Sequence, residues 1–189
     1  MICISPPQTL VDTHTHTYLC KHAEYIQPEA YLEMAAQQGF THFAFCDHNP
    51  FEGDAYDVIH RMSFAEFAFF NNTYARLRSE AAQKHQLKLL KYMEVDWQVF
   101  DNAKTLNFVD QHLQDFDGVL GSIHMNDMAE KRWMNEHSVE EFLDMYRTQW
   151  LAMVDSGRFQ IASQADFFRY AHPLIAELDR DVEYSERIN

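Results

Sequence analysis

The chain has 189 residues, of which 47% are hydrophobic, and this is enough for one well-buried core. It carries 29 acidic against 15 basic residues, and the resulting formal charge of -14 repels nucleic-acid phosphates and anionic membrane surfaces. We therefore expect neither a nucleic acid nor a membrane as a partner.

No linker rich in proline, glycine or serine and no internal repeat divides the sequence, so we expect one domain over residues 1–189. The first ten residues lack the basic and apolar regions of a secretion signal, and no apolar run approaches membrane-spanning length. The 3 cysteines form no C-x-x-C pair. This pattern predicts a reduced, cytoplasmic setting.

Strand-like and helix-like segments alternate along the chain, which predicts an α/β protein with parallel strands. The expected strands cover residues 8–13, 41–46, 87–95, 118–123 and 159–162. The expected helices begin at Pro28, after Ser63, near Thr105 and after Ser138. After Asp166 there is room for one short helix and a strand fragment.

Two of these helices carry capping boxes, in which a serine is followed three residues later by a glutamate. Ser63 and Glu66 open a helix that reaches about His85, and Ser138 and Glu141 open one that continues through Val154. Apolar residues at helical spacing form a stripe on the first of them, which we interpret as core rather than a cofactor pocket: Phe67, Phe70, Tyr74, Leu77 and Ala81.

Nearly every expected strand ends at a side chain of a type that binds metal ions in proteins. In chain order these are His14 and His16, Asp47 and His48, Glu94, His124, and finally Gln164 and Asp166. In a (β/α) barrel, residues from several strand ends meet in one site at the carboxyl face. The pattern therefore predicts a metal site. For the stretch around His14 and His16 taken alone, the alternative is a histidine-rich loop whose side chains bind no metal.

Five segments resemble motifs of the PHP (polymerase and histidinol phosphatase) superfamily, and the first is most similar to its histidinol-phosphatase-like branch. They read DTHTHTYLCKHAE, FCDHNPF, YMEVDW, GSIHMND and SGRFQIASQADFFRY, and together they extend over nearly the whole chain. The resemblance implies a distorted (β/α)₇ barrel that binds two or three divalent metal ions, which would be Zn, Fe or Mn.

The resemblance also implies roles for single residues. His14, His16 and Glu94 would bind the first metal, and Glu94 would bridge to a second metal that His124 also binds. His22 and His48 would bind the third. A hydroxide shared by the metals would then attack the phosphorus of a phosphomonoester.

Two further residues have a functional and a structural interpretation. Asp47 would protonate the leaving group or, as we slightly favour, orient a ligand imidazole. Arg61 resembles part of an Arg-Met pair in this branch and would bind the substrate phosphate, or it is a solvated arginine before a helix. Lys131 and Arg132 are weaker candidates for the phosphate contact, and Cys20 is expected to be a small packed residue.

Two departures from the family pattern bear on activity. Gln164 stands where relatives carry a histidine that completes the second metal site, and an amide is a poor ligand for Zn or Fe. The family's last motif, G-S-D-x-H, does not follow Asp166. Because a full barrel takes ~250 residues, the chain corresponds to the N-terminal two-thirds of one. It is either a fragment of a longer protein or a shortened member of the family. A shortened member would close its sheet in another way, for example with a second copy of the chain in a homo-oligomer.

The sequence therefore predicts a metal-dependent phosphatase of the histidinol-phosphatase type, acting on a small phosphorylated substrate. Two alternatives stay open. One is a degenerate, non-catalytic relative that binds a phosphorylated ligand or a partner. The other is a phosphoesterase for nucleotides, which would need aromatic residues such as Phe51, Tyr56 or Trp97 to stack on a base.

Overall fold

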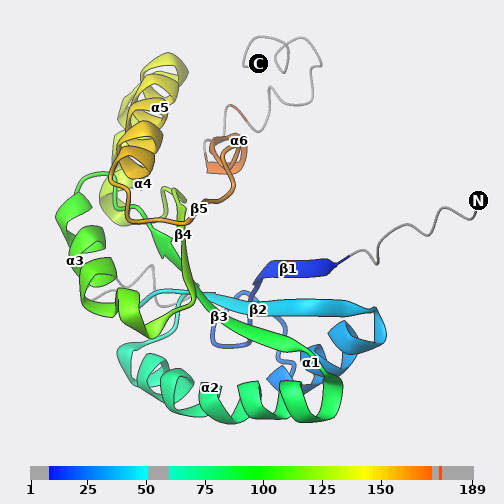
Figure 1. Cartoon of the computed structure of the whole chain (residues 1–189). Coiled ribbons are helices and arrows are strands. Elements are labelled where there is room, and N and C mark those ends of the chain that lie inside the picture. Colours follow the sequence, from blue (N-terminus) through cyan, green and yellow to red (C-terminus); the bar gives the residue numbers. More distant parts are fainter. Residues whose placement is uncertain (1–8, 51–59, 172–174, 176–189) are drawn as a thin grey trace, which may run out of the picture. The chain divides into compact units, whose positions relative to one another are not determined.

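The structure is a computed structural model, and it describes residues 9–50, 60–171 and 175 (Figure 1). Contacts between Cα atoms group these residues into two compact units. Unit 1 holds the described parts of Met1–Phe51, Val58–Met93 and Gln114–Gly118, and unit 2 holds those of Glu94–Leu113 and Val119–Asn189. Strand β3, Lys88–Asp96, runs from the first unit into the second.

Unit 1 alternates strands and helices in the predicted order. It contains β1 (Leu10–Thr15), α1 (Pro28–Gln37), β2 (Phe40–His48), α2 (Phe64–His85) and most of β3. The strands follow one another in the order β1, β2, β3, and β1 pairs with β2 in parallel. Figure 1 shows α1 and α2 together on the same side of β2 and β3.

The helix ends of unit 1 follow the local sequence. Pro28 occupies the start of α1, where its missing N–H costs no hydrogen bond, and Gly39 takes a positive φ of 83° just beyond the helix. Ser63 and Glu66 form the predicted capping box of α2. The buried residues of α2 are the five of the predicted apolar stripe, so its assignment to the core is confirmed.

Two strands of this unit extend further than predicted. β2 includes Asp47 and His48, and β3 continues to Asp96. Polar residues ended the expected strands, but hydrogen bonding with neighbouring strands holds these residues in extended backbone. β1 begins at Leu10, and the predicted strand residue Gln8 lies outside the described part of the chain.

Unit 2 contains mainly helices around short strands. Its elements are α3 (Asn102–His112), β4 (Gly118–Ser122, from its second residue), α4 (Met128–Glu136), α5 (Val139–Asp155), β5 (Ile161–Ala162) and α6 (Phe168–Ala171). A 3₁₀ turn, Leu113–Asp115, precedes β4. β4 and β5 pair in parallel. The order of elements matches an α/β protein with parallel strands.

The core of unit 2 forms where α5 packs on β4. Phe142, Tyr146 and Met153 of α5 are buried with Ile123, which follows the strand. A Cβ atom at Gly121 would lie 2.8 Å from the sulfur of Met153. It would also lie 2.8 Å from Cγ of Phe159, so any larger residue at Gly121 would force these side chains to move.

Helix α4 was not predicted, although its start carries a capping box formed by Asp127 and Glu130. The predicted third helix begins earlier than Thr105, because Asp101 caps α3 by accepting a hydrogen bond from the N–H of Lys104. The fifth strand is shorter than residues 159–162. Among the described residues, no helix combines the length and apolar character that crossing a membrane requires.

Candidate functional site

Four imidazole rings gather at the carboxyl ends of β1 and β2 in unit 1, and we call His14, His16, His22 and His48 the histidine cluster. The ring centre of His16 lies 5.1 Å from that of His14, 5.0 Å from that of His22 and 4.8 Å from that of His48. One ring nitrogen each of His16, His22 and His48 lies within 4.8 Å of the others. This arrangement has the spacing of a metal site.

The parallel pairing of β1 and β2 brings the cluster together. His14 lies in β1, His16 follows it directly, and His48 is the last residue of β2. Since parallel strands end at the same edge of a sheet, the side chains of the two strand ends meet there. The N–H of His14 also donates to Oδ1 of Asp12 at 2.9 Å.

Asp47 accepts two hydrogen bonds from Thr17, in the loop between His16 and His22. Its Oδ1 accepts the N–H of Thr17 at 2.6 Å, and its Oδ2 accepts the Thr17 hydroxyl at 2.8 Å. Burial raises the pKa of Asp47 to about 6, although the hydrogen bonds from Thr17 and Cys20 favour the carboxylate. Cys20 is fully buried, and its Sγ accepts the N–H of His48 at 2.9 Å. The predicted packed cysteine is confirmed.

Arg61 lies beside this loop and is only 3% exposed, so the interpretation as a solvated arginine is wrong. Its Nη1 donates to Oδ1 of Asn49 at 3.2 Å. The ring of His60 lies 6.1 Å from that of His22, and no role was predicted for His60. Lys21 forms an ion pair with Glu66 of the α2 capping box, which ties the loop to that helix.

Unit 2 holds a second cluster, formed by Glu94, Asp96, His124, Ser163 and Gln164. Glu94 and His124 are 0% and 5% exposed, and Oε1 of Glu94 lies 3.5 Å from Nε2 of His124. Ser163 directs its hydroxyl to the same Glu94 oxygen at 3.3 Å. The two predicted metal ligands of unit 2 therefore lie side by side.

Asp96 holds the opposite side of the His124 ring. Its Oδ1 lies 3.2 Å from Nδ1 of His124 and accepts the His124 backbone N–H at 3.1 Å. Burial alone lowers the pKa of His124, but Asp96 and Glu94 outweigh it and raise that pKa to about 10. The role of Asp96 was missed, although residues two apart on a strand share a face and Glu94 was already a candidate.

Gln164 reaches the remaining nitrogen of this ring. Its Oε1 lies 2.8 Å from Nε2 of His124, and its backbone has a positive φ of 58°. The position at which the family resemblance implies a histidine therefore points at His124 in this chain. Here it offers a neutral amide oxygen.

The structure thus assembles four predicted ligands in unit 1 and two in unit 2. That Glu94 shares a metal with His14 and His16 stays a prediction. Trp97 is buried at 3% exposure and donates its indole N–H to Gln149 at 2.9 Å, which leaves it unsuited to stacking on a base. Phe51 and Tyr56, the other aromatic candidates, lie outside the described residues.

Comparisons with known proteins find two informative relatives. A curated protein of Shewanella halifaxensis named as a probable phosphatase is 30% identical over 115 residues, which cover 61% of this chain and 40% of that protein. The crystal structure of histidinol phosphate phosphatase from Lactococcus lactis, complexed with Zn, L-histidinol and phosphate, matches with a TM-score of 0.65 at 18% identity. That match covers 86% of this chain and 60% of the solved one.

The chain therefore spans roughly half the length of the relatives it matches. The structural likeness confirms the predicted fold, a part of a PHP-type (β/α) barrel. The family profile described as the PHP domain matches residues 12–188, which is nearly the whole sequence. With the strand-end histidines and this match, the chain belongs to the PHP domain family.

Proposed function

We propose that this chain is the metal-binding part of a phosphoesterase that hydrolyses a small phosphomonoester. The histidine cluster carries the proposal, because three imidazole nitrogens within 4.8 Å of one another form a donor set for a transition metal. Phosphatase relatives of the PHP family support the reaction class. A Lactococcus relative that was solved with zinc, histidinol and phosphate supports histidinol phosphate as a first substrate to test.

The donor sets of both units fit a divalent cation. Imidazoles suit Zn, Fe or Mn, and the carboxylate of Glu94 beside His124 adds the negative charge that a second cation favours. Cations bound by these residues would supply a hydroxide nucleophile at neutral pH and charge for the phosphoryl oxygens. We assign His14, His16, His22 and His48 to metal binding in unit 1, and Glu94 and His124 in unit 2.

The surrounding residues position these groups. We assign Asp47 to holding Thr17, and with it the loop between His16 and His22, since its two oxygens accept both hydrogen bonds of that residue. Asp96 would orient His124 as a carboxylate orients a metal-bound imidazole. Arg61 is assigned to the substrate phosphate, because it is buried beside this loop and a guanidinium can bind two phosphate oxygens at once.

The contact between Gln164 and His124 favours a second candidate, a relative that binds phosphorylated ligands with little turnover. The amide oxygen of Gln164 lies 2.8 Å from Nε2 of His124, which is the ring nitrogen that would face a metal. An amide is a weaker ligand than the histidine of relatives, so metal occupancy in unit 2 would fall. The proposed enzyme is therefore a slow one.

Phosphate release from histidinol phosphate tests the proposal. The wild type, His124→Ala and the control His112→Ala, which changes a histidine at the end of α3, are compared after removal of metals and again after addition of Zn or Mn. We expect metal-dependent release by wild type and control, and at least a tenfold loss in His124→Ala. Equal release by all three would contradict the role given to His124, and no release with any phosphomonoester would contradict a phosphoesterase.

A further inference from the structure

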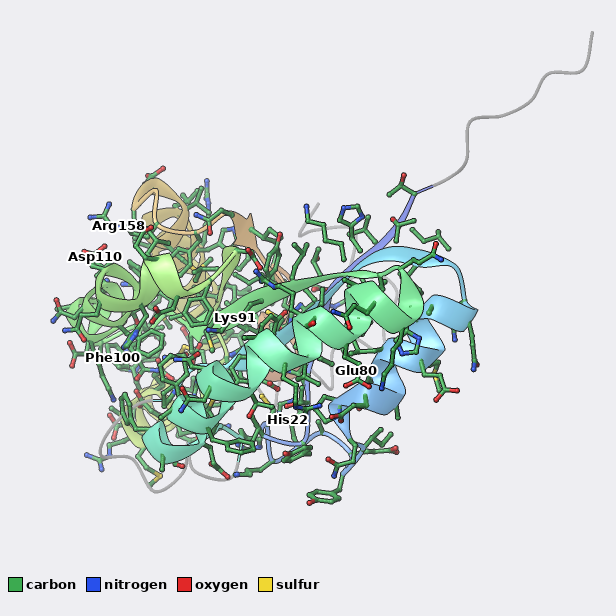
Figure 2. The ribbon with its side chains drawn as sticks, turned by 60° about the horizontal axis from the view of Figure 1, so that its bottom comes forward. His22, Glu80, Lys91, Phe100, Asp110 and Arg158 are labelled. Atoms are coloured by element: carbon green, nitrogen blue, oxygen red, sulfur yellow. The ribbon has the colours of Figure 1, made fainter. Side chains whose placement is uncertain are left out.

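A buried lysine lies in unit 1 among aromatic rings that the proposed reaction does not use. Lys91 of β3 is 8% exposed and lies beside α2 (Figure 2). Its Nζ lies 5.8 Å from the ring centre of Phe70, 5.7 Å from that of Tyr74 and 5.1 Å from that of Phe116. Among the described residues, this ammonium has neither a hydrogen-bond partner nor an ion pair.

The lysine borders a cavity in which two further polar groups lack hydrogen-bond partners in the described part of the chain. The cavity has a volume of about 390 Å³, and Asn71, Tyr74 and Lys91 all line it. Oδ1 of Asn71 and the hydroxyl of Tyr74 are buried and form no hydrogen bond with a described residue. Buried polar groups without partners are costly, so a ligand that satisfied all three would gain free energy on binding.

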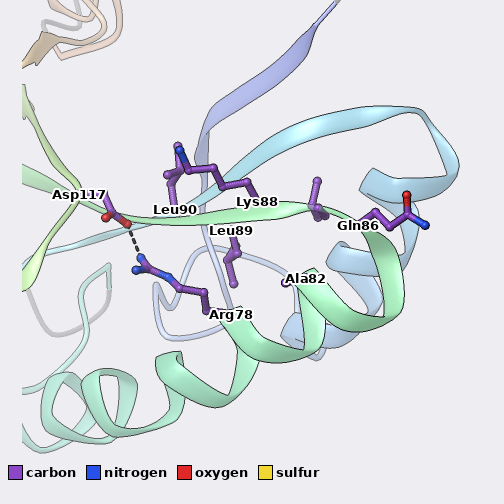
Figure 3. A pocket seen from close by; sticks show the side chains of 8 residues that line it. Arg78, Ala82, Gln86, Lys88, Leu89, Leu90 and Asp117 are labelled. Atoms are coloured by element: carbon purple, nitrogen blue, oxygen red, sulfur yellow. Dashed lines mark hydrogen bonds and ion pairs between the residues drawn. The ribbon is translucent and has the colours of Figure 1, made fainter.

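The charged residues around the cavity indicate which charge such a ligand carries. Arg78 of α2 forms an ion pair with Asp117 (Figure 3). Asp117 also accepts the backbone N–H of Lys91 at 2.8 Å. These two charges therefore offset each other. The remaining charged residues of the lining are Lys91 and Asp115, which have opposite signs. Burial lowers the pKa of Lys91, and an anion beside the ammonium would reverse that effect.

From this geometry we infer that the cavity between α2, β3 and the Gln114–Asp117 segment binds a small carboxylic acid with an adjacent hydroxyl or amino group. The carboxylate would accept hydrogen bonds from Lys91 and Tyr74. The adjacent O–H or N–H would donate to Asn71. Phosphate dianions fit less well, because Asp115 and Asp117 repel a second negative charge.

Titrations followed by amide NMR test this site, using glycolate and glycine as probes and acetate and methylammonium as comparisons. We expect glycolate and glycine to shift the amide signals of Lys91, Asn71 and Asp117 in a saturable way. Acetate lacks the donor and methylammonium lacks the carboxylate, so both should bind more weakly. Saturable shifts confined to the histidine cluster, or none at all, would overturn the inference.

Matched variants separate the site from general effects of charge. Lys91→Met keeps the length of the side chain and removes the ammonium, whereas Lys88→Met removes an exposed lysine of the same strand. We expect glycolate affinity to fall about tenfold or more in Lys91→Met, as for a lost charge-assisted hydrogen bond, and to stay unchanged in Lys88→Met.

Tyr74→Phe provides an independent check should Lys91→Met not fold. It keeps the ring over which the lysine lies and removes only the hydroxyl. We expect a smaller but measurable loss of glycolate affinity with unchanged dispersion of the amide spectrum. Wild-type affinity in every folded variant would overturn the assignment.

Discussion

At the scale of single residues, His124 is held through both ring nitrogens. Asp96 lies at Nδ1 and Gln164 at Nε2, at 3.2 and 2.8 Å. A carboxylate at one nitrogen of an imidazole orients the other toward a metal, so Asp96 would support the metal binding that we propose. Gln164 would compete for that second nitrogen and so lower the proposed metal occupancy at Glu94 and His124.

Gln164→His should raise metal affinity and turnover, because an imidazole replaces a weak amide ligand. We expect a tighter binding of Zn or Mn by calorimetry and faster phosphate release, each by about tenfold or less. Gln111→His, on an exposed position of α3, is the control and should change neither. Identical metal affinity in wild type and Gln164→His would refute the role given to this position.

Glu130 gives a prediction for pH. Burial and the nearby Asp96 and Asp127 raise the pKa of Glu130 to about 8. Between its ordinary pKa and about 8, the folded state holds a proton that the unfolded state has lost, so folding stability falls as pH rises through this window. Glu130→Gln removes this dependence and keeps an oxygen that can accept the N–H of Val99.

Urea unfolding of wild type and Glu130→Gln at pH 5 and pH 8 measures the effect. From pH 5 to pH 8, we expect the free energy of unfolding to fall less in Glu130→Gln than in the wild type. The exposed Glu136→Gln at the end of α4 is the control and should follow the wild type. A steeper decline in Glu130→Gln would contradict the direction of the shift.

At the scale of elements, the sequence predicted a helix best where a capping box marks its start and an apolar stripe marks its buried face. The capping box of Ser63 fixed the start of α2, and the buried face of that helix has the predicted residues. Helix α4, which contains the candidate phosphate contacts Lys131 and Arg132, was missed because it is short and because an aspartate rather than a serine opens it. Strand ends were placed too early, since pairing with neighbouring strands overrides the local preference of Asp47, His48 and Asp96.

Removal of the α2 cap should destabilise unit 1. Ser63→Ala loses the bond that the serine oxygen accepts from the N–H of Glu66, and we expect a loss of about 1 kcal/mol in the free energy of unfolding. Ser79→Ala, in the exposed middle of the same helix, should be near neutral. Chemical denaturation compares the two, and equal stabilities would show that the cap contributes nothing.

At the scale of the whole molecule, the alternation of strand-like and helix-like segments predicted an α/β protein with parallel strands. The division into two units could not be predicted, because it depends on contacts between segments far apart in the sequence. The same limit applies to the sharing of Glu94 with the histidine cluster. The cluster within each unit could be predicted, since each depends on residues at neighbouring strand ends.

Metal binding should stabilise the fold by mass action, because the ligands come together only in the folded chain. We expect the melting temperature of chelated protein to rise by several degrees when a large excess of Zn or Mn is added, since binding at 100 times Kd contributes about 2.7 kcal/mol. The double variant His14→Ala/His16→Ala should show a much smaller rise. An equal rise would place the metal elsewhere.

The metal content of purified protein tests the central claim most directly. Elemental analysis of protein prepared without chelator compares the wild type, His14→Ala/His16→Ala and a control variant, His42→Ala, whose histidine lies in β2 outside the histidine cluster. The account predicts Zn, Fe or Mn well above trace in the wild type and in His42→Ala, and the loss of most of it in the double variant. Equal metal content in all three proteins, or none in the wild type, would contradict it.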